Sequence, residues 1–277
     1  MIKHIRYAIL ILLIINACKG ETMSGPKFTF KDLNEVPIST WENLAGKKIF
    51  FGHQSVGSNI MDGINDVIKD NPSIKLNVKE TDQTVDISGG IFAHFPIGKN
   101  EDAGAKIQDF TLKMQQRIGD KADIAFFKFC FVDVTADTDV QKLFNLYQKA
   151  LSSLKREYPH IAFVHVTVPL LKTNKAGIRT VMNKILGKSG GFFDNANNIK
   201  RNQYNDLLKK EYEGKEPLFD LAGFESAYPD GSRESFTQGG KMYYSLVPGY
   251  TEDGGHLNIE GRKRVAGQLL IFLAQLK

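Results

Sequence analysis

Ser55 stands where an apolar run breaks, in the segment IFFGHQSVGSN at residues 49–59. Ligands of open α/β sheets bind just beyond the carboxyl ends of the strands, and a serine placed there can act as a nucleophile if a base takes its proton. Serine is also a preferred first residue of helices, so Ser55 could instead cap the helix that the following residues predict. A base elsewhere in the chain is needed to favour the first interpretation.

Histidine is the natural base near neutral pH, and His256 has the most suggestive surroundings. It lies in GYTEDGGHLNIEG, where Asp253 precedes it by three residues and two glycines lie between them. A carboxylate at this spacing can fold back onto Nδ1 of the imidazole and leave Nε2 facing a nucleophile. We therefore predict that Ser55 is the nucleophile, His256 the general base and then acid, and Asp253 the orienting carboxylate.

The other histidines are weaker candidates for the base. His53 is only two residues before Ser55 and could line the same turn. His94, in IFAHFPIG, could line a pocket, but no carboxylate lies near it in the sequence. His165 alternates with apolar residues inside a predicted strand, which is typical of a hydrogen-bonded core residue.

Apolar runs of strand length alternate with longer amphipathic stretches along most of the chain. Strands are predicted at 47–52, 74–78, 123–132, 161–168 and 217–221, and helices at 57–69, 103–118, 140–157 and 261–277. This alternation predicts βαβ units and an α/β fold, a three-layer α/β/α sandwich with a mostly parallel five-stranded sheet. The long connections 170–198 and 222–252 precede elements that end at one edge of the sheet, where long loops are often functional.

The first residues predict export. Residues 1–17 have a basic start and an apolar stretch too short to span a bilayer, as in a signal peptide. The tetrapeptide at 15–18 resembles the lipobox of bacterial lipoproteins, which predicts lipidation of Cys18, with an ordinary secretory signal as the alternative. We expect 18–40 to form a lipid-anchored tether and 41–277 a single domain, held at a membrane in the periplasm or at the cell surface.

Composition narrows the possible partners. The 277-residue chain has a formal net charge of +5, but its lysines and arginines are dispersed, so no nucleic-acid partner is predicted. Cys130 is the only cysteine besides Cys18, so a chain lipidated at Cys18 has no internal disulfide. Nothing in the sequence fixes an oligomeric state.

Taken together, these motifs resemble those of the SGNH/GDSL hydrolases. The shared features are a strand that ends in a small-residue serine turn, a late Asp-x-x-His-Leu-Asn before a helix, and RNQYNDLLKKEY…PLFDL at 201–221. The resemblance spans nearly the whole chain from Lys47 onward. It implies an SGNH/flavodoxin-like sandwich in which Ser55, His256 and Asp253 have the triad roles given above.

Two motifs depart from the family pattern. The first block reads His53-Gln54-Ser55 instead of Gly-Asp-Ser, and Val132 stands where the family has the asparagine that donates to the oxyanion. The resemblance then implies an oxyanion hole built from the backbone N–H of Ser55 and that of Gly89 or Gly90. Loss of one such donor costs roughly 10²–10³ in rate.

Four side chains are predicted to compensate for the missing donor or to contact substrate, namely His53, Gln54, Asn59 and Lys128. Asn59 lies one helical turn beyond Ser55 and so on the same helix face. Lys128 is a lone cation in an apolar strand, where an unpaired charge is costly. It is therefore either a lysine that faces the sheet edge or a site residue.

The sequence as a whole predicts an exported serine esterase or acyl hydrolase. By resemblance, its substrate is an O-acetylated carbohydrate or, second, a lipid or small aryl ester, and a sugar hydroxyl in place of water would make it an O-acyltransferase. One alternative is a degenerate SGNH domain that binds a glycan or a partner without catalysis. Another is a metal site built from His53, His94, His256 and Asp253, but no close ligand spacing supports it. No cofactor or metal is predicted.

Overall fold

The computed structural model describes residues 27–83, 89–173 and 194–276. The predicted signal peptide at 1–17 and the predicted lipidation site at Cys18 lie outside these ranges. Within the described ranges, none of the helices combines the length and the apolarity needed to cross a membrane.

A six-stranded parallel sheet forms the centre of the molecule, in the order β2-β3-β1-β4-β5-β6. Its strands are β1 (Lys48–His53), β2 (Val78–Glu80), β3 (Ile91–Pro96), β4 (Ile124–Phe127), β5 (Ala162–Val166) and β6 (Leu218–Phe219). The predicted α/β fold with a parallel sheet is confirmed, but the predicted count of five strands is wrong. The sequence prediction missed β3, because His94 and Pro96 interrupt its apolar run, and it placed β2 too early, at 74–78.

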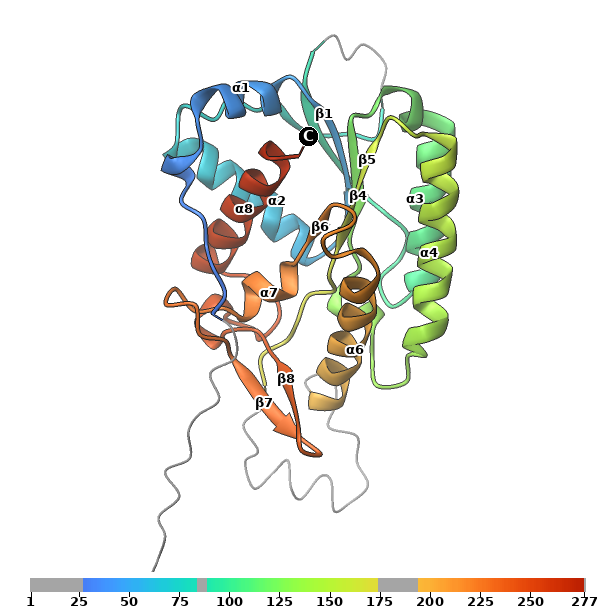
Figure 1. Cartoon of the computed structure of the whole chain (residues 1–277), viewed down its shortest axis with the longest axis vertical. Coiled ribbons are helices and arrows are strands. Elements are labelled where there is room, and N and C mark those ends of the chain that lie inside the picture. The colour runs from blue at the N-terminus through green and yellow to red at the C-terminus, as the bar shows by residue number, and fades with distance from the viewer. Residues whose placement is uncertain (1–26, 84–88, 174–193, 277) are drawn as a thin grey trace, which may run out of the picture.

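Helices cover both faces of the sheet, as expected for a three-layer sandwich (Figure 1). On one face lie α1 (Ile38–Ala45), α2 (Val56–Asp70), α7 (Leu221–Ser226) and α8 (Ile259–Ala274), and on the other α3 (Ala103–Lys113), α4 (Val140–Glu157) and α6 (Asn195–Tyr212). Short helical turns are η1 (Leu33–Glu35), η2 (Met114–Ile118), η3 (Gly119–Lys121), η4 (Phe131–Asp133) and η5 (Pro248–Tyr250). The predicted helices at 57–69, 103–118, 140–157 and 261–277 match α2, α3 with η2, α4 and α8.

The two helix layers enclose two apolar cores, one on each face of the sheet. Alternate residues of β1 supply them, with Ile49 and Phe51 in the core under α2 and α8 and Phe50 in the core under α3 and α4. The helices α2 and α8 approach closely at Gly63, where a Cβ would lie 2.3 Å from the carbonyl oxygen of Arg262. This contact fixes α2, and with it the turn that carries Ser55, against the helix that follows His256.

Residues 27–40, the last part of the predicted tether, pack against the domain. The N–H of Phe28 donates to the carbonyl of Gly231, at 2.9 Å, and the rings of Phe28 and Phe30 contact the ring of Phe224. Both rings are partly buried, and their contacts hold the segment against the domain. A hairpin of β7 (Ser235–Gln238) and β8 (Lys241–Tyr244), which the sequence did not predict, lies in the connection 222–252.

Candidate active site

Ser55 occupies a strained turn between β1 and α2. Its backbone has φ 55° and ψ −116°, a conformation that costs a non-glycine residue about 1–3 kcal/mol and that tends to occur at functional sites. Ser55 stands at the first position of the helix, but its side chain makes no capping hydrogen bond. The capping interpretation therefore fails, and the hydroxyl is directed elsewhere.

The hydroxyl of Ser55 meets His256, which lies 201 positions later in the sequence. Ser55 Oγ is 2.7 Å from His256 Nε2, and His256 Nδ1 is 2.6 Å from Asp253 Oδ2. With the ring proton on Nδ1, where the carboxylate accepts it, Nε2 is free to accept the proton of the serine. Serine, histidine and aspartate thus form one continuous hydrogen-bonded chain.

The loop before α8 holds Asp253 firmly in this arrangement. Asp253 Oδ1 accepts from the backbone N–H groups of Gly255 and His256, at 2.9 and 2.8 Å, and the hydroxyl of Thr251 lies 3.2 Å away. Partial burial raises the pKa of Asp253, but the hydrogen bonds from Gly255 and from the ring and backbone of His256 outweigh it and lower that pKa to about 2. The carboxylate is therefore ionised throughout the neutral range.

The hydrogen bond between His256 and Asp253 contributes little to folding. The side chains of His256 and Asp253 are 45% and 57% exposed, and exposed pairs typically contribute about 0–1 kcal/mol. The ring of Phe131 packs against the imidazole with 5.4 Å between ring centroids. A well-ordered but solvent-accessible pair of this kind is better explained by chemistry than by stability.

Asn59 and Gln54, predicted to contact substrate, are engaged within the protein. Asn59 Oδ1 accepts from the N–H of Leu257 at 3.2 Å and so ties α2 to the loop that carries His256. Gln54 Nε2 donates to the carbonyls of Ile97 and Gly98, both at 2.7 Å. The contacts of Gln54 use both protons of its amide, which corrects the prediction that it supplies the missing donor. The contact of Asn59 uses only its oxygen, so its donor role stays a prediction.

Lys128 is neither at the sheet edge nor in the pocket described below. It is 1% exposed, and its Nζ contacts the carbonyl of Phe129 at 3.2 Å and the sulfur of Cys130 at 3.5 Å. Burial lowers its pKa. Since Cys130 Sγ in turn donates to the carbonyl of Gln54, Lys128 lies behind the serine turn as a buried support.

Gly89 and Gly90, predicted as oxyanion donors, lie at the amino-terminal ends of the strands, away from Ser55. They precede β3, whose first residue pairs with Lys48 at the start of β1, and a Cβ on Gly90 would lie 1.8 Å from the carbonyl oxygen of Ala45. Ser55 follows the opposite end of β1. The error arose because β3 was not recognised as a strand, so the loop after it was not considered.

That loop, residues 97–102, contains a polar group that sequence reasoning missed. Asn100 Oδ1 accepts from Lys106 Nζ at 2.9 Å, and the same Nζ lies 2.6 Å from Asp133 in a fully buried ion pair. Asp133 also accepts from the N–H groups of Glu101 and Cys130. The loops after β3 and β4 are thereby joined on either side of the serine turn.

The rings of His53 and His94 form a hydrogen-bonded pair beside Ser55. His53 Nε2 lies 3.0 Å from His94 Nδ1, and the rings stack with 5.2 Å between centroids. Burial, with smaller contributions from Lys128 and His94, lowers the pKa of His53 to about 3, and burial also lowers that of His94. Both rings are therefore uncharged at neutral pH.

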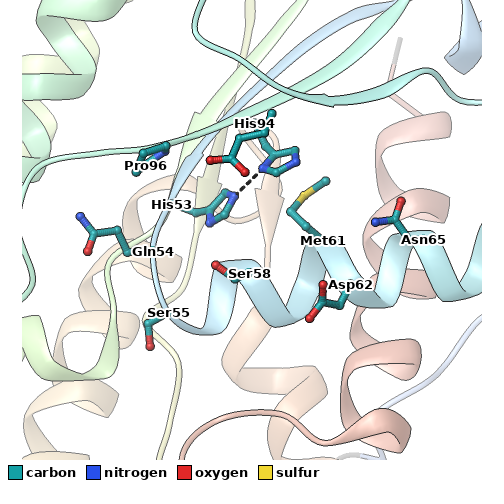
Figure 2. A pocket seen from close by; sticks show the side chains of 10 residues that line it. His53, Gln54, Ser55, Ser58, Met61, Asp62, Asn65, His94 and Pro96 are labelled. Carbon is teal, nitrogen blue, oxygen red and sulfur yellow. Dashed lines mark hydrogen bonds between the residues drawn. The ribbon is translucent and has the colours of Figure 1, made fainter.

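A pocket of about 620 Å³ opens between this pair and α2 (Figure 2). It is lined by His53, Gln54, Ser55, Ser58, Met61, Asp62, Asn65, Glu80, His94 and Pro96. His94 was predicted to lack a nearby carboxylate, but Glu80 of β2 pairs with it in register and acts on its pKa. The pocket places several polar groups next to the serine hydroxyl.

The structure also bears on the predicted role of His165 and on the alternative metal site. His165 is fully buried and bonded to the hydroxyl of Tyr147 at 2.8 Å, which confirms it as a core residue. Across the described ranges, no group of three or more histidine, cysteine, aspartate or glutamate side chains is arranged to hold a metal ion. The four residues of the alternative metal site fall into two separate pairs.

No family model matches the chain, and no curated protein matches it either. Among solved structures, a Streptococcus pneumonia protein described as a candidate platelet activating factor is 16% identical, with 85% of this chain and 90% of that chain covered and a TM-score of 0.49. An extracellular lipase from Streptomyces rimosus is 13% identical, with 82% and 98% covered and a TM-score of 0.43. The periplasmic domain of a Salmonella lipopolysaccharide acetyltransferase is 11% identical, with 84% and 88% covered and a TM-score of 0.40. These are distant likenesses, so the fold and the site described above rest on the geometry of this chain.

Proposed function

We propose that this protein is a serine-dependent acyl hydrolase of the SGNH/GDSL type. The observation that carries the proposal is the unbroken chain from Ser55 Oγ to His256 Nε2, at 2.7 Å, and from His256 Nδ1 to Asp253 Oδ2, at 2.6 Å. The strained strand-to-helix turn at Ser55 supports it, since such turns expose a nucleophilic serine in other hydrolases.

In this mechanism His256 moves one proton in each half of the reaction. Ser55 Oγ attacks the acyl carbonyl while Nε2 accepts the hydroxyl proton, and the imidazolium then gives that proton to the oxygen of the leaving alcohol. Water attacks the resulting acyl-serine with Nε2 as base again, which releases the carboxylic acid and restores the serine. Asp253 keeps the ring in the required tautomer and stabilises its charged form.

The oxyanion needs donors other than the family asparagine, which is Val132 here. The backbone N–H of Ser55 has no acceptor among the described residues, so it is available to the developing negative charge. We assign the second donor to the carboxamide of Asn100, whose oxygen is already held by Lys106. The same donors would serve an O-acyltransferase, in which a sugar hydroxyl replaces water.

The cellular setting of the proposal comes from the sequence. A signal peptide at 1–17 and a lipid on Cys18 would hold the enzyme at a membrane outside the cytoplasm, where acylated glycans are its proposed substrates. Incorporation of labelled palmitate by the wild type but not by Cys18→Ser would support this anchor. Equal incorporation by both proteins would contradict it.

A fluorophosphonate probe tests the proposed function directly. An activated serine attacks the phosphorus, forms an Oγ–P bond and expels fluoride, so the protein acquires a stable label. We expect labelling of the wild type and loss of labelling in Ser55→Ala and in His256→Ala. Ser153→Ala is the control, because Ser153 is an exposed serine on α4, outside the pocket, and it should label like the wild type.

The competing function is a non-catalytic binding domain, which the valine at position 132 favours. Absence of labelling from a wild-type protein that melts cooperatively would contradict the hydrolase and leave the binding domain. Labelling that persists in Ser55→Ala would contradict the assignment of the nucleophile.

A further inference from the structure

A buried lysine lies behind the loop that follows β3. Lys106, in the first turn of α3, is fully buried, and its Nζ lies 2.6 Å from Oδ2 of Asp133, whose side chain is also fully buried. Removing two charges from water is costly unless their remaining hydrogen-bonding groups are also used. The same Nζ donates to Oδ1 of Asn100 at 2.9 Å, and Asn100 is exposed. The buried ion pair is thus bonded directly to one carboxamide at the surface.

Asp133 joins the loops after β3 and β4 without Lys106. Its carboxylate accepts from the backbone N–H of Glu101 at 2.9 Å and from that of Cys130 at 2.6 Å. The contact between Lys106 and Asn100 is separate from this backbone connection, and the side chain of Asn100 has no other hydrogen bond among the described residues. What the lysine contributes beyond the connection is therefore the orientation of the carboxamide.

The chemistry of an ammonium group decides which end of the carboxamide it holds. Lysine has three N–H donors and no acceptor, so Lys106 can bond only to the oxygen of Asn100. The amide nitrogen, Nδ2, is then the free end of the group, and it has no acceptor among the described residues. Because hydrogen bonds in a chain polarise one another, a cation bonded to the oxygen also makes the amide a stronger donor.

The backbone on both sides of Asn100 is fixed as well. Gln54, in the serine turn, donates to the carbonyls of Ile97 and Gly98, both at 2.7 Å. Gly98 has a φ of 49°, and Glu101, which is not a glycine, has a φ of 69°. Such a conformation of a non-glycine residue persists only where the surrounding structure enforces it. A donor held in this way needs no reorganisation when negative charge develops beside the serine.

We propose that Lys106, held by Asp133, is a positioning residue that fixes the carboxamide of Asn100 as a donor toward the acyl oxygen at Ser55. Lys106 does not itself touch the substrate and acts only through Asn100. The use of this donor in catalysis rests on the proposed function, whereas the fixed orientation of the carboxamide does not. In this assignment an asparagine after β3 replaces the one that the family has after β4, and Gln54 ties its loop to the serine turn.

The side-chain amide signals of Asn100 test the orientation without any catalysis. These NMR signals are assigned by their absence from Asn100→Ala, and their ¹⁵N relaxation gives an order parameter for the carboxamide. We expect a value near about 0.85 in the wild type and below about 0.6 in Lys106→Met. A mobile carboxamide in the wild type, or an unchanged order parameter in Lys106→Met, would overturn the proposal.

A second variant and a control separate this effect from a loss of folding. Lys106→Met leaves the carboxylate of Asp133 buried without its cation, so Lys106→Met/Asp133→Asn, which removes both charges, is measured beside it and should show the same mobility. Lys113→Met is the matched control, because Lys113 lies on the same helix and pairs with Asp82 at 2.7 Å. The carboxamide should stay rigid there. Equal mobility in Lys113→Met would show a general loosening of α3 and would overturn the proposal.

Hydrolysis of p-nitrophenyl acetate tests whether the fixed donor is used. We expect Asn100→Ala to lower kcat by about 10²-fold or more and Lys106→Met/Asp133→Asn to lower it by about tenfold, with KM changed by less than about twofold. In the Asn100→Ala background, the loss caused by Lys106→Met/Asp133→Asn should shrink to less than about twofold, because both changes act through one donor. A tenfold loss that persists in that background would overturn the positioning role.

The two measurements also separate failure of this proposal from failure of the proposed function. A rigid carboxamide that Lys106→Met loosens, in a wild type without Ser55-dependent hydrolysis, would support the orientation by Lys106 and contradict the hydrolase. Ser55-dependent hydrolysis that neither Asn100→Ala nor Lys106→Met/Asp133→Asn reduces would support the hydrolase and overturn both the donor and its positioning residue.

Discussion

Two hydrogen-bonded pairs near the Ser55 turn, His256–Asp253 and His53–His94, differ in burial and in the group that the histidine is bonded to. His256 is exposed and bonded to the carboxylate of Asp253. His53 is buried and bonded to a second neutral imidazole, that of His94, and its pKa is lowered to about 3. In the first pair the imidazole is bonded to a carboxylate, whereas in the second two uncharged rings are bonded to each other.

In the proposed mechanism, desolvation and the partner group, not closeness in the sequence, decide which histidine acts as the base. His53 is two residues from Ser55, yet its ring lies against the core and its Nε2 faces β3. His256 comes from the loop before α8 and meets the serine hydroxyl at 2.7 Å. Burial penalises the imidazolium at His53, and no carboxylate is bonded to that ring to offset the penalty.

The largest effect should come from breaking the carboxylate–imidazole pair. Asp253→Asn keeps the size of the side chain and the oxygen that accepts from the backbone, but it replaces Oδ2, which accepts from the His256 ring, with an NH₂ group that can only donate. The tautomer is then no longer fixed, so we expect kcat for p-nitrophenyl acetate to fall by about 10²–10⁴. Glu252→Gln is the matched control, since it removes an exposed carboxylate from the adjacent position. A loss of less than tenfold in Asp253→Asn, or an equal loss in Glu252→Gln, would contradict the role of Asp253.

The buried histidine His53 should instead affect how the free energy of unfolding changes with pH. The folded pKa of His53, about 3, is below its unfolded value of 6.5, so only the unfolded chain binds a proton between these values. Stability is therefore fully present above pH 6.5 and decreases as the pH falls toward 3, by at most about 1.4 kcal/mol per pH unit for one group. His165, with a folded pKa of about 4, adds a decrease of the same sign.

Urea unfolding at pH 7, 6 and 5 measures this slope. We expect His53→Phe to lose less stability on acidification than the wild type, with the contribution of His165 remaining. His160→Gln, a change at an exposed turn, is the control. A slope in His53→Phe equal to that of the wild type would show that His53 is not buried in its neutral form.

The sequence predicted the layers of the fold because periodicity survives wherever an element buries one face. The helix at 140–157 was predicted with the bounds that α4 has, since its apolar stripe is regular. By contrast, β3 carries His94 and Pro96 on the face that lines the pocket, so its pattern looks like a loop. The missed strand β3 is thus one whose residues line the pocket.

Within the site, too, local patterns could be predicted from the sequence and long-range contacts could not. Ser55 and the Asp253–His256 spacing were identifiable because a glycine-flanked serine and a close Asp-His pair are local patterns. The His53–His94 pair, the contact of Glu80 with His94 and the Lys106–Asp133 ion pair join residues from separate loops and strands. No local pattern encodes such contacts, so only the structure reveals them.

Backbone strain offers a smaller but clean distinction between the serine turn and the helix next to it. Ser55→Gly and Ser55→Ala both remove the hydroxyl, so their difference isolates the φ 55°, ψ −116° backbone. We expect the glycine variant to be more stable by about 1–2 kcal/mol in urea unfolding, since glycine accepts this conformation without strain. At Ser58, inside α2, the order should reverse, with glycine less stable than alanine by about 0.5–1 kcal/mol.

The smallest expected effect concerns the tie between α2 and the His256 loop. Asn59 Oδ1 holds the N–H of Leu257, but the same loop is also fixed by Asp253 and by the bond from the N–H of Lys172 to Gly254. Loss of one tie among several should therefore lower kcat of Asn59→Ala only about two- to tenfold, with KM unchanged, because misplacing His256 affects proton transfer and not binding. Asn59→Asp keeps an acceptor oxygen and should recover most of the rate. If neither variant differed from the wild type, Asp253 alone would suffice to position His256. The contrast between His256 and His53 would then depend only on the carboxylate bonded to His256.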